Sequence, residues 1–415
     1  MSSDVQKPRI INSQKTISRL LAVARRAKQA VPYYQSSFAG IDLASPSLQL
    51  TDLPMLTKEA ARSAQEALVK PEYLGQQSNT VIQRTSGSTG IPLRLIRTHA
   101  EVLRGALPLW QARAAIFPDV LESLAVSIYP YSIRGNDTYQ EVPGARRKGQ
   151  IISFSTQGWH IDHMASCLDR LDYLKPAWLF GPPALLSILA EALRRSKRRL
   201  HKNLVFVESN SDWLSPETRN LLAETFNCRI ANQYGSQETY TIAYECSKGT
   251  MHLFEQSVVV ELHPCGDREE NELVVSSLIF EAMPFIRYRL GDFIQMGTEP
   301  CLCGNTTPVL GYVRGRVGDV IAGTALHGGF VFFHVITWLT NMGIDTILQY
   351  TVHQTALNHF VVQLHLKDPS LLKEIGFHFQ DVANVWLPHA QFSFEAVDQM
   401  ALTPGGKIQS FIRHI

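Results

Sequence analysis

Residues 84–92 of the sequence, Arg-Thr-Ser-Gly-Ser-Thr-Gly-Ile-Pro, are rich in glycine and hydroxyl groups that could bind phosphate. The two glycines allow the backbone to approach a ligand closely, and the hydroxyls and loop amides are hydrogen-bond donors. The flanking segments 79–83 and 93–97 are predicted to be strands, and a donor-rich loop between strands suits phosphate oxygens. The stretch is not a Walker A loop, because no Lys-Ser or Lys-Thr pair follows its second glycine. On its own it fits an ordinary hairpin turn equally well.

A second polar stretch, residues 232–239, follows a predicted strand at 228–231 and reads Asn-Gln-Tyr-Gly-Ser-Gln-Glu-Thr. Open α/β sheets bind ligands at the carboxyl ends of their strands. Tyr234 could stack on a base, Gly235 would permit close approach, and Glu238 could hold a hard cation such as Mg²⁺. The alternative is a polar exit from a strand into a loop.

Two further charged residues lie beside glycines. Asp292 closes the sequence Tyr-Arg-Leu-Gly-Asp, which is predicted to end a strand on a turn, and its carboxylate could accept hydrogen bonds from ribose hydroxyls. Lys407 follows Gly-Gly in a loop near residue 405, and its ammonium could neutralise charge that develops on a phosphoryl group. A simple Gly-Asp turn and a flexible tail lysine are the respective alternatives.

Soft metal-ligand side chains occur in two segments, with Cys246 and His252 in one and Cys301 and Cys303 in the other. Three thiolates and one imidazole make a closed tetrahedral zinc site, provided that the two segments meet in space. Cys265 is a rival ligand, and four unrelated residues or a redox pair remain alternatives. With six cysteines in 415 residues and no secretory signal, a disulfide framework is not expected.

The composition is that of a soluble globular protein, with 45% hydrophobic and 18% charged residues. The net charge of +2, from 39 basic and 37 acidic residues, gives no reason to expect nucleic acid or a membrane surface as the main partner. The amino terminus is polar, and no apolar run is long enough to span a membrane, so a cytoplasmic location is expected.

The predicted elements change in character along the chain. Residues 8–40 carry a helical stripe, and apolar residues at helical spacing, Leu103 and Leu107 among them, predict a helix over 99–117. From 123 to 231 strands alternate with helices, which indicates parallel pairing with helices on the faces. Short strands after 240, one of them expected at 285–290, indicate an antiparallel, partly barrel-like region. Two glycines near 315 suit a hinge. The remaining residues, with an alternating strand expected at 359–366 and a helix at 369–384, can form a small α+β domain.

Taken together and in this order, the motifs resemble the adenylate-forming acyl-ligase superfamily, and most closely its phenylacetate–coenzyme A ligase branch. The matching segments are 85–90 (phosphate loop), 234–238 (adenine and magnesium motif), 288–292 (ribose motif), 315–319 (hinge) and 404–407 (catalytic lysine). The resemblance implies an α/β fold. A large N-terminal domain, 1–315, has parallel and mixed sheets with helices and a partly barrel-like β region. It is hinged at Asp319 to a small, mobile α+β domain, 316–415.

The resemblance also implies residue roles. Lys407 would be catalytic. The residues implied for ATP and AMP binding are Thr85, Ser86, Gly87, Ser88, Thr89, Gly90, Tyr234, Gly235, Ser236, Glu238, Asp292 and Arg316. Glu238 would hold Mg²⁺. The four side chains Cys246, His252, Cys301 and Cys303 look like the structural Zn²⁺ cluster of this branch. The acid pocket would be built around Tyr129, Tyr131, Gly181 and Gly235.

The implied reaction uses ATP to convert a small carboxylic acid, expected to be aromatic, into an acyl-adenylate, and then passes the acyl group to the thiol of coenzyme A. Transfer to a carrier-protein thiol or to an amine is the first alternative. A non-catalytic nucleotide-binding protein on a degenerate ligase fold is the second.

Three departures from the family pattern limit what the resemblance implies. Leu93, followed by Arg94, stands where a lysine often follows the proline of the phosphate loop. Residues 208–212 read Glu-Ser-Asn-Ser-Asp where Gly-Ala-Glu is usual. The loop after Tyr129 does not match the phenylacetate pattern. The sequence therefore leaves open which acid is used, and it also leaves open the oligomeric state, with a homodimer as one option.

Overall fold

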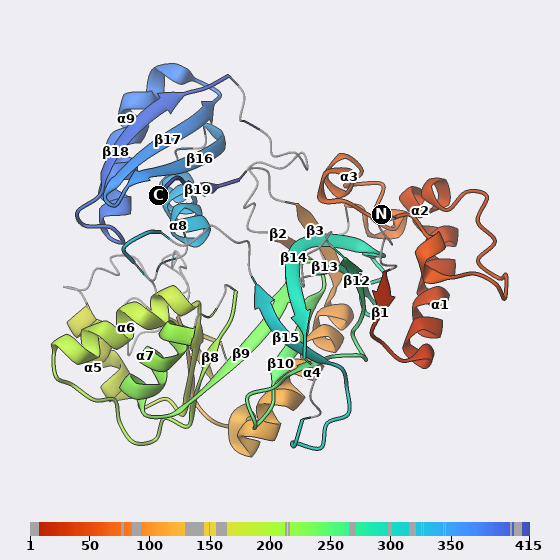
Figure 1. The fold of residues 1–415 in the computed structure, drawn as a ribbon, viewed down its shortest axis with the longest axis horizontal. Helices are drawn as coiled ribbons and strands as arrows, with labels where there is room; N and C mark the ends of the chain where they lie inside the picture. Colours follow the sequence, from red (N-terminus) through yellow and green to blue (C-terminus); the bar gives the residue numbers. More distant parts are fainter. Residues whose placement is uncertain are drawn as a thin grey trace, which may run out of the picture. The chain divides into compact units, whose positions relative to one another are not determined.

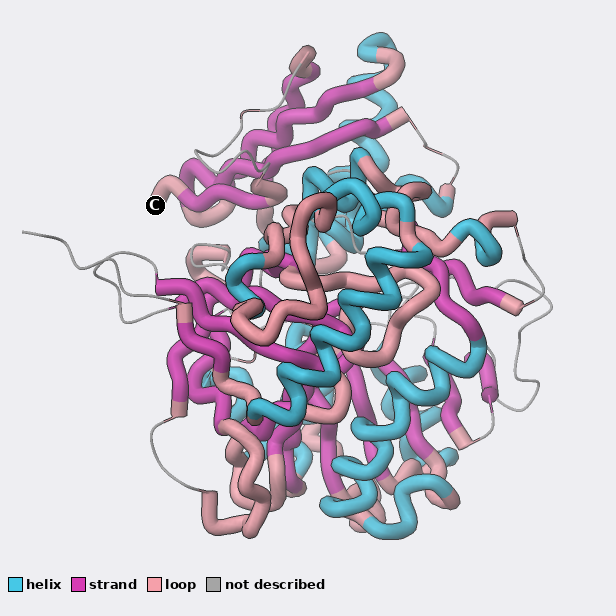
Figure 2. Tube along the Cα trace, turned by 90° about the vertical axis from the view of Figure 1, so that its right-hand side faces the viewer, coloured by secondary structure: helices cyan, strands magenta, loops and turns pink. Residues whose placement is uncertain are grey.

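The structure is a computed structural model (Figures 1 and 2). The residues that it describes are 8–75, 79–84, 93–128, 145–148, 150–154, 164–211, 214, 216–264, 271–297, 301–314, 321–324, 326, 328–342, 344, 346–398, 401 and 409–415. They group into two compact units. The first comprises the described residues of 1–85, 93–118 and 231–316, and the second those of 119–230 and 317–415. Among the described residues, no helix combines the length and the apolar character that crossing a bilayer requires.

The first unit begins with a short strand and two helices. β1 (Arg9–Ile10) precedes α1 (Gln14–Ala30) and α2 (Pro32–Ser37). The predicted helical stripe over 8–40 is divided at Val31, whose extended backbone (φ −115°, ψ 116°) ends α1 where Pro32 begins the next helix. A shorter helix, α3 (Lys58–Ser63), starts where Thr57 accepts a hydrogen bond from the Ala60 amide at 3.1 Å, as an N-cap does.

Antiparallel strands make up most of the first unit. Their order is β1, β12 (Val258–Pro264), β13 (Asn271–Ser277), β14 (Tyr288–Met296), β15 (Val309–Arg314), β11 (Met251–Leu253), β10 (Tyr240–Glu245) and β9 (Arg229–Ser236). The antiparallel region predicted after residue 240 is therefore confirmed. No pairing between β1 and β9 is found among the described residues, so these strands do not close into a barrel.

One boundary in this region differs from the sequence prediction. A strand was expected at 285–290, but β14 starts only at Tyr288. Arg287 has φ 51°, a left-handed conformation that interrupts an extended strand. Its buried guanidinium binds Glu261 at 2.8 Å and also donates to the carbonyls of Thr51 and Leu53. These bonds hold the N-terminal segment and stabilise the backbone conformation that the sequence pattern could not indicate.

A two-stranded hairpin and a long helix complete the first unit. β2 (Thr80–Arg84) and β3 (Arg94–Thr98) are antiparallel, with Arg84 opposite Arg94. The strands predicted on either side of the glycine-rich loop are thus paired, while the loop itself lies outside the described residues. α4 (His99–Ile116) follows with a capping box, in which Thr98 and Glu101 bond each other's backbone amides.

The helix predicted over 99–117 is present as α4, but its apolar repeat does not mark the buried face. Leu103 is 73% exposed and Leu107 is 55% exposed, whereas Gly105 is buried. A Cβ placed on Gly105 would lie 2.7 Å from the Tyr240 ring and 2.9 Å from the Phe280 ring. α4 therefore packs the face that carries Gly105 against the rings of Tyr240 and Phe280, and a larger residue at position 105 would collide with them.

In the second unit, the predicted alternation of strands and helices is confirmed. Its sheet has the order β8 (Phe206–Ser209), β7 (Trp178–Gly181), β4 (Ala125–Ile128), β6 (Ile151–Phe154) and β5 (Ala145–Lys148). The pairs among β8, β7, β4 and β6 are parallel, and β5 is antiparallel to β6. The helices are α5 (Met164–Leu174), α6 (Pro183–Arg195) and α7 (Pro216–Phe226). Parallel strands of this kind need crossover helices.

The C-terminal residues form the predicted small α+β module. Its sheet has the order β18 (Gln391–Ala396), β17 (His359–Leu366), β16 (Ile347–Ala356) and β19 (Phe411–Arg413), with α8 (Gly328–Asn341) and α9 (Leu372–Asn384) (Figure 1, blue). Figure 2 shows these strands side by side next to the marked C-terminus. The core is aromatic, with Phe332 stacked on Phe379 and Phe411. The short strand β19 had no signal in the sequence analysis.

Candidate active site

Two of the motifs singled out in the sequence meet within the first unit. Tyr234 lies on β9 and Asp292 on β14, and the Tyr234 hydroxyl donates a hydrogen bond of 2.8 Å to Oδ2 of Asp292. Burial and the charge of Asp292 raise the pKa of Tyr234 well above its usual value, so the phenol remains a hydrogen-bond donor. The predicted adenine and ribose motifs are therefore in direct contact.

Asp292 lies inside a strand, which corrects the expectation that it follows a turn at the strand end. Val274 on β13 pairs with Arg289 on β14, and Glu272 on β13 pairs with Phe293 on β14. Between these two pairs the chain moves two residues along β13 but four residues along β14. The extra residues form a bulge that contains Gly291, with φ 80°. Pairing resumes after the bulge, so β14 continues to Met296 instead of ending. Bulges redirect side chains, and this one carries Asp292.

Glu238 lies in the turn between β9 and β10 and is only 6% exposed. The Tyr288 hydroxyl donates a hydrogen bond of 2.9 Å to its Oε1 atom, and burial raises the pKa of Tyr288. The turn is closed by Ser236, whose hydroxyl oxygen accepts from the Thr239 amide at 3.2 Å. Tyr234 of the 234–238 motif thus bonds Asp292, and Tyr288 of the 288–292 motif bonds Glu238. These crossed hydrogen bonds hold both carboxylates in place.

Gly235 lies opposite Thr241 where β10 passes close to β9. A Cβ on this residue would lie 2.4 Å from the carbonyl oxygen of Tyr240 and 3.0 Å from the Thr241 Cα. Packing within the hairpin accounts for this glycine. Gly181 is similar, because a Cβ there would lie 2.4 Å from the carbonyl oxygen of Ile128 on the neighbouring strand β4. Gly181 is thereby explained by packing between β7 and β4.

A buried arginine that the sequence analysis did not select holds the Glu238 turn. Arg97 on β3 is 1% exposed and donates to the carbonyl oxygen of Glu238 at 3.0 Å, and also to that of Gln237. It shares a strand face with Leu93 and Leu95, which are 0% and 1% exposed. A charge on the apolar face of a strand was the signal that could have identified it.

Several predicted site residues lie outside the described residues. They are Thr85, Ser86, Gly87, Ser88, Thr89 and Gly90 of the glycine-rich loop, Tyr129, Tyr131, Cys265, Arg316, Asp319 and Lys407. The described members of the predicted site are Tyr234, Gly235, Ser236, Glu238, Asp292, Gly181 and the four metal-ligand candidates.

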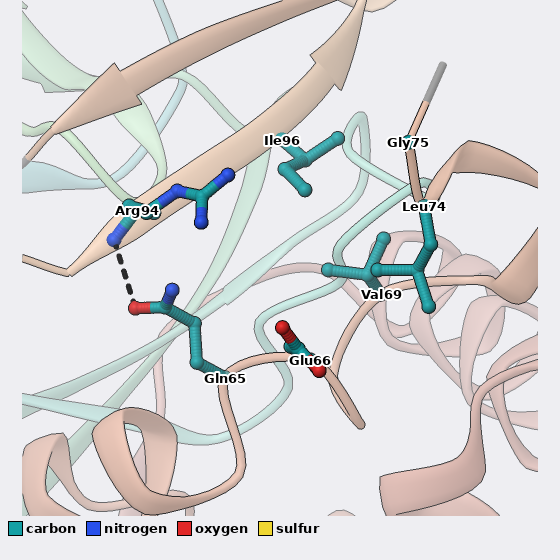
Figure 3. A pocket seen from close by; sticks show the side chains of 7 residues that line it. All are labelled: Gln65, Glu66, Val69, Leu74, Gly75, Arg94 and Ile96. Carbon is teal, nitrogen blue, oxygen red and sulfur yellow. Dashed lines mark hydrogen bonds between the residues drawn. The ribbon is translucent and has the colours of Figure 1, made fainter.

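A small cavity lies beside strand β3. It has a volume of about 190 Å³ and is lined by Gln65, Glu66, Val69, Leu74, Gly75, Arg94 and Ile96 (Figure 3). Its polar side is formed by Gln65, Glu66 and Arg94, with the Arg94 amide donating to the Gln65 side-chain oxygen at 3.1 Å. Ligand pockets typically measure about 300–1,000 Å³. This cavity is smaller than a nucleotide site, and neither Glu238 nor Asp292 lines it.

The cysteine and histidine side chains converge as predicted. The ligand atoms of Cys246, His252, Cys301 and Cys303 all lie within 4.8 Å of one another. The two sulfur atoms of Cys246 and Cys301 are 3.5 Å apart, and the Cys303 sulfur lies 3.3 Å from Nε2 of His252. The other ring nitrogen of His252 lies 3.4 Å from the Thr307 hydroxyl. A partner on Nδ1 orients Nε2 toward the cluster.

The cluster also has suitable chemistry for a metal. Hydrogen bonds from Thr250 and His252 lower the pKa of the Cys301 thiol to about 6, so the thiolate is available near neutral pH. Three sulfur atoms and one imidazole nitrogen are the donor set of a closed, four-coordinate zinc site. The residues therefore fit a structural Zn²⁺ ion.

Comparison with known proteins agrees with these motifs. The family model described as AMP-binding enzyme matches residues 19–266, more than half of the chain. The chain belongs to the AMP-binding enzyme family. The predicted resemblance to adenylate-forming ligases is confirmed at this level.

Two curated proteins are similar to this AMP-binding enzyme. Protein CapK of Staphylococcus aureus is 22% identical over 267 residues, which is 60% of this chain and 55% of CapK. The phenylacetate-coenzyme A ligase of Thermus thermophilus is 25% identical over 158 residues, 35% of this chain and 36% of the ligase. The matches thus span about half of the first protein and about a third of the second.

Solved structures share the fold. A 2-hydroxyisobutyryl-CoA ligase, in complex with 2-HIB-AMP and CoA in the thioesterification state, matches with a TM-score of 0.63 and 17% identity. The match covers 97% of this chain and 90% of that ligase. An open conformation of the same ligase matches with a TM-score of 0.59, over 96% and 90% of the two chains. The α/β fold class predicted from the sequence is confirmed.

Proposed function

We propose that this AMP-binding enzyme activates a small carboxylic acid with ATP to form an acyl-adenylate and then transfers the acyl group to the thiol of coenzyme A. The observation that carries the proposal is the crossed pair of hydrogen bonds, Tyr234 to Asp292 and Tyr288 to Glu238. It brings two motifs that are 50 or more residues apart to one place, with both carboxylates held in position.

A free carboxylate is a poor acyl donor, because the oxygen that would have to leave is strongly basic. The acid must therefore be activated before its acyl group can be transferred. In the first step a carboxylate oxygen attacks the α-phosphorus of ATP, the bond to the β-phosphate oxygen breaks, and pyrophosphate leaves. In the second step a thiolate attacks the acyl carbon, the bond to the phosphate oxygen breaks, and AMP leaves. Asp292 would accept hydrogen bonds from the ribose, Tyr234 would pack on the adenine, and Gly235 and Ser236 would line the nucleotide. Mg²⁺ on Glu238 would screen the phosphate charges.

The glycine-rich loop, residues 85–90, and Arg316 would hold the phosphates and the ribose. Lys407 would stabilise the charge that develops between the carboxylate and the α-phosphate. The domain of residues 316–415 would turn at Asp319, so that Lys407 withdraws and a thiol can reach the adenylate.

An aromatic acid and coenzyme A are the substrates that we propose. The similarity to a protein named phenylacetate-coenzyme A ligase supports an aryl acid, and the similar fold of a ligase bound to an acyl-AMP and CoA supports the thiol. The acid pocket would include Tyr129, Tyr131, Gly181 and Gly235. We propose that the protein works in the cytoplasm.

The experiment that tests this function measures pyrophosphate release with ATP, Mg²⁺ and hydroxylamine across a panel of aryl and short aliphatic acids. We expect an aryl acid to give the highest kcat/KM, and coenzyme A to convert the adenylate into a thioester. A tightly bound adenylate that coenzyme A does not discharge would instead indicate a carrier-protein or amine acceptor. No acid above background would favour a non-catalytic nucleotide-binding protein. The same preparation, analysed by light scattering, distinguishes a monomer from a homodimer.

We further propose that Cys246, His252, Cys301 and Cys303 hold one structural Zn²⁺ ion. Elemental analysis of protein purified without chelator is expected to give about one zinc per chain. Cys303→Ser should lose most of that metal and lower Tm by at least about 5 °C, because metal binding and folding are coupled. Cys228→Ser is the matched control, since burial raises the pKa of the Cys228 thiol to about 12, and it should keep the metal. Folded wild-type protein without metal would disprove the zinc site.

A further inference from the structure

Arg97 connects the hairpin that carries the glycine-rich loop to the turn that carries Glu238. Its Nη2 atom donates to the carbonyl oxygens of Gln237 and Glu238, which lie about 140 residues away in sequence. Its Nη1 atom donates to Oε1 of Gln83, on the paired strand β2. The same Gln83 oxygen accepts a hydrogen bond of 3.1 Å from the Tyr240 hydroxyl, on the strand that follows the turn. The Arg97 side chain therefore bonds both the β2–β3 hairpin and the turn that carries Glu238.

The surroundings of the Arg97 guanidinium fix its plane. Its central carbon lies 4.3 Å from the ring centre of Tyr240 and 4.1 Å from that of Phe280. The two rings pack edge to face, at 4.8 Å, and Gly105 of α4 leaves the space that they occupy. Rings at these distances attract the cation and block rotation of its side chain.

No carboxylate within the described part of the chain is hydrogen-bonded to the Arg97 guanidinium. Among the residues that the structure describes, the hydrogen-bond acceptors of this guanidinium are neutral oxygens of Gln83, Gln237 and Glu238. Burial lowers the pKa of Arg97, an effect that Tyr240, Glu238 and Glu101 partly offset. Burying a cation costs desolvation free energy that apolar packing at the same position would not cost, so the fixed bonds of Arg97 are a reason to look for a task besides stability.

We propose that Arg97 is a positioning residue that holds the Glu238 turn in register with the β2–β3 hairpin and so fixes where the Glu238 carboxylate can bind the Mg²⁺ of Mg²⁺–ATP. This inference rests on the proposed function, because it assumes that Mg²⁺–ATP binds at Glu238. On this proposal Arg97 acts through the backbone of the turn and not as a ligand of the metal or the nucleotide. Its bonds go to the backbone of residues 237 and 238, and through that backbone they set where the Glu238 side chain begins.

A lysine cannot replace this arginine. The planar guanidinium forks toward several acceptors in fixed directions, whereas an ammonium is a point charge on a flexible stem. Arg97→Lys keeps the charge but cannot bond the Gln83 oxygen and both carbonyls in the same geometry. Residues that orient a metal ligand typically affect metal affinity by about 10- to 100-fold when replaced.

The test is calorimetric titration of ATP at a series of Mg²⁺ concentrations. For Arg97→Lys we expect the Mg²⁺ concentration that half-saturates ATP binding to rise at least about tenfold, with kcat at saturating Mg²⁺ within about threefold of wild type. Gln83→Met leaves Arg97 in place but removes the side-chain acceptor of its guanidinium. This variant should raise the half-saturating Mg²⁺ concentration about threefold. Should Arg97→Lys fail to fold, the Gln83→Met result decides the matter.

Arg113→Lys is the matched control. Arg113 is also a buried arginine of the first unit, 5% exposed, with its guanidinium 4.6 Å from the Trp110 ring centre. Its replacement should lower Tm but leave the Mg²⁺ dependence unchanged. Unchanged Mg²⁺ dependence in Arg97→Lys and Gln83→Met, with only Tm lowered, would overturn the positioning role. Wild-type protein that binds Mg²⁺–ATP but activates no acid would contradict the proposed ligase function without affecting this result.

Discussion

Lys407→Ala is expected to lower acid-dependent pyrophosphate release by about 10²–10³-fold, while ATP still binds. As the carboxylate attacks the α-phosphorus, negative charge builds up on the bridging oxygens, and an ammonium placed there stabilises the transition state more than the ground state. Since the ammonium acts mainly in the transition state, kcat should fall and the Kd for ATP should change little. Stopped-flow pyrophosphate release and calorimetric ATP titration measure the two quantities.

Lys367→Ala is the control for this variant, because Lys367 is an exposed lysine of the same C-terminal module. It should retain wild-type activity. A second measurement separates the half-reactions: when a preformed acyl-adenylate is supplied with coenzyme A, Lys407→Ala should form thioester within about threefold of the wild-type rate. Adenylation at the wild-type rate in Lys407→Ala would remove the catalytic assignment of this lysine.

Elements with strong local patterns were predicted well from the sequence. β17 alternates buried and partly exposed residues along its length, and α9 carries a clear apolar stripe, so each pattern matches the period of its own element. The convergence of Cys246 with Cys301 was also predicted, because the ligand types limit what such a set could form. In each of these cases the information lies in residue type and spacing.

The sequence did not predict local structure correctly where contacts between residues far apart in the chain determine that structure. The bulge at Gly291 depends on how β14 pairs with β13, and a Gly-Asp pair alone reads as a turn. The buried face of α4 depends on the aromatic pair Tyr240 and Phe280, which leaves Leu103 exposed against its own apolar pattern. Local propensity cannot reveal these choices, because the partner residues lie far along the chain.

Arg97 shows the same limit within the candidate site. On the sequence it is one basic residue in a short strand, and its partners Gln237 and Glu238 belong to a different motif. The motifs indicated which side chains could bind a nucleotide. The contacts between motifs, such as the Tyr234–Asp292 bond, became visible only in the folded chain. Those contacts set how firmly each carboxylate is held.

Glu238→Gln is the second substitution with a large expected effect. The amide has nearly the shape of the carboxylate, and its oxygen can still accept the bond that the Tyr288 hydroxyl donates to Oε1. The fold of the turn should therefore persist, while the negative charge and a strong Mg²⁺ ligand are lost. We expect adenylation at a fixed, moderate Mg²⁺ concentration to fall roughly 10²-fold, with partial recovery at high Mg²⁺.

Tyr288→Phe provides the matched control, since it removes the hydroxyl but leaves the Glu238 carboxylate able to bind the cation. Its effect on adenylation should be small, about threefold, with no shift toward high Mg²⁺. Rates of pyrophosphate release measured against Mg²⁺ at fixed ATP distinguish the two variants, and Tm measurements show that both are folded. Equal losses in the two variants would mean that the Tyr288–Glu238 bond serves the fold alone. Glu238 would then no longer qualify as the Mg²⁺ ligand of this site.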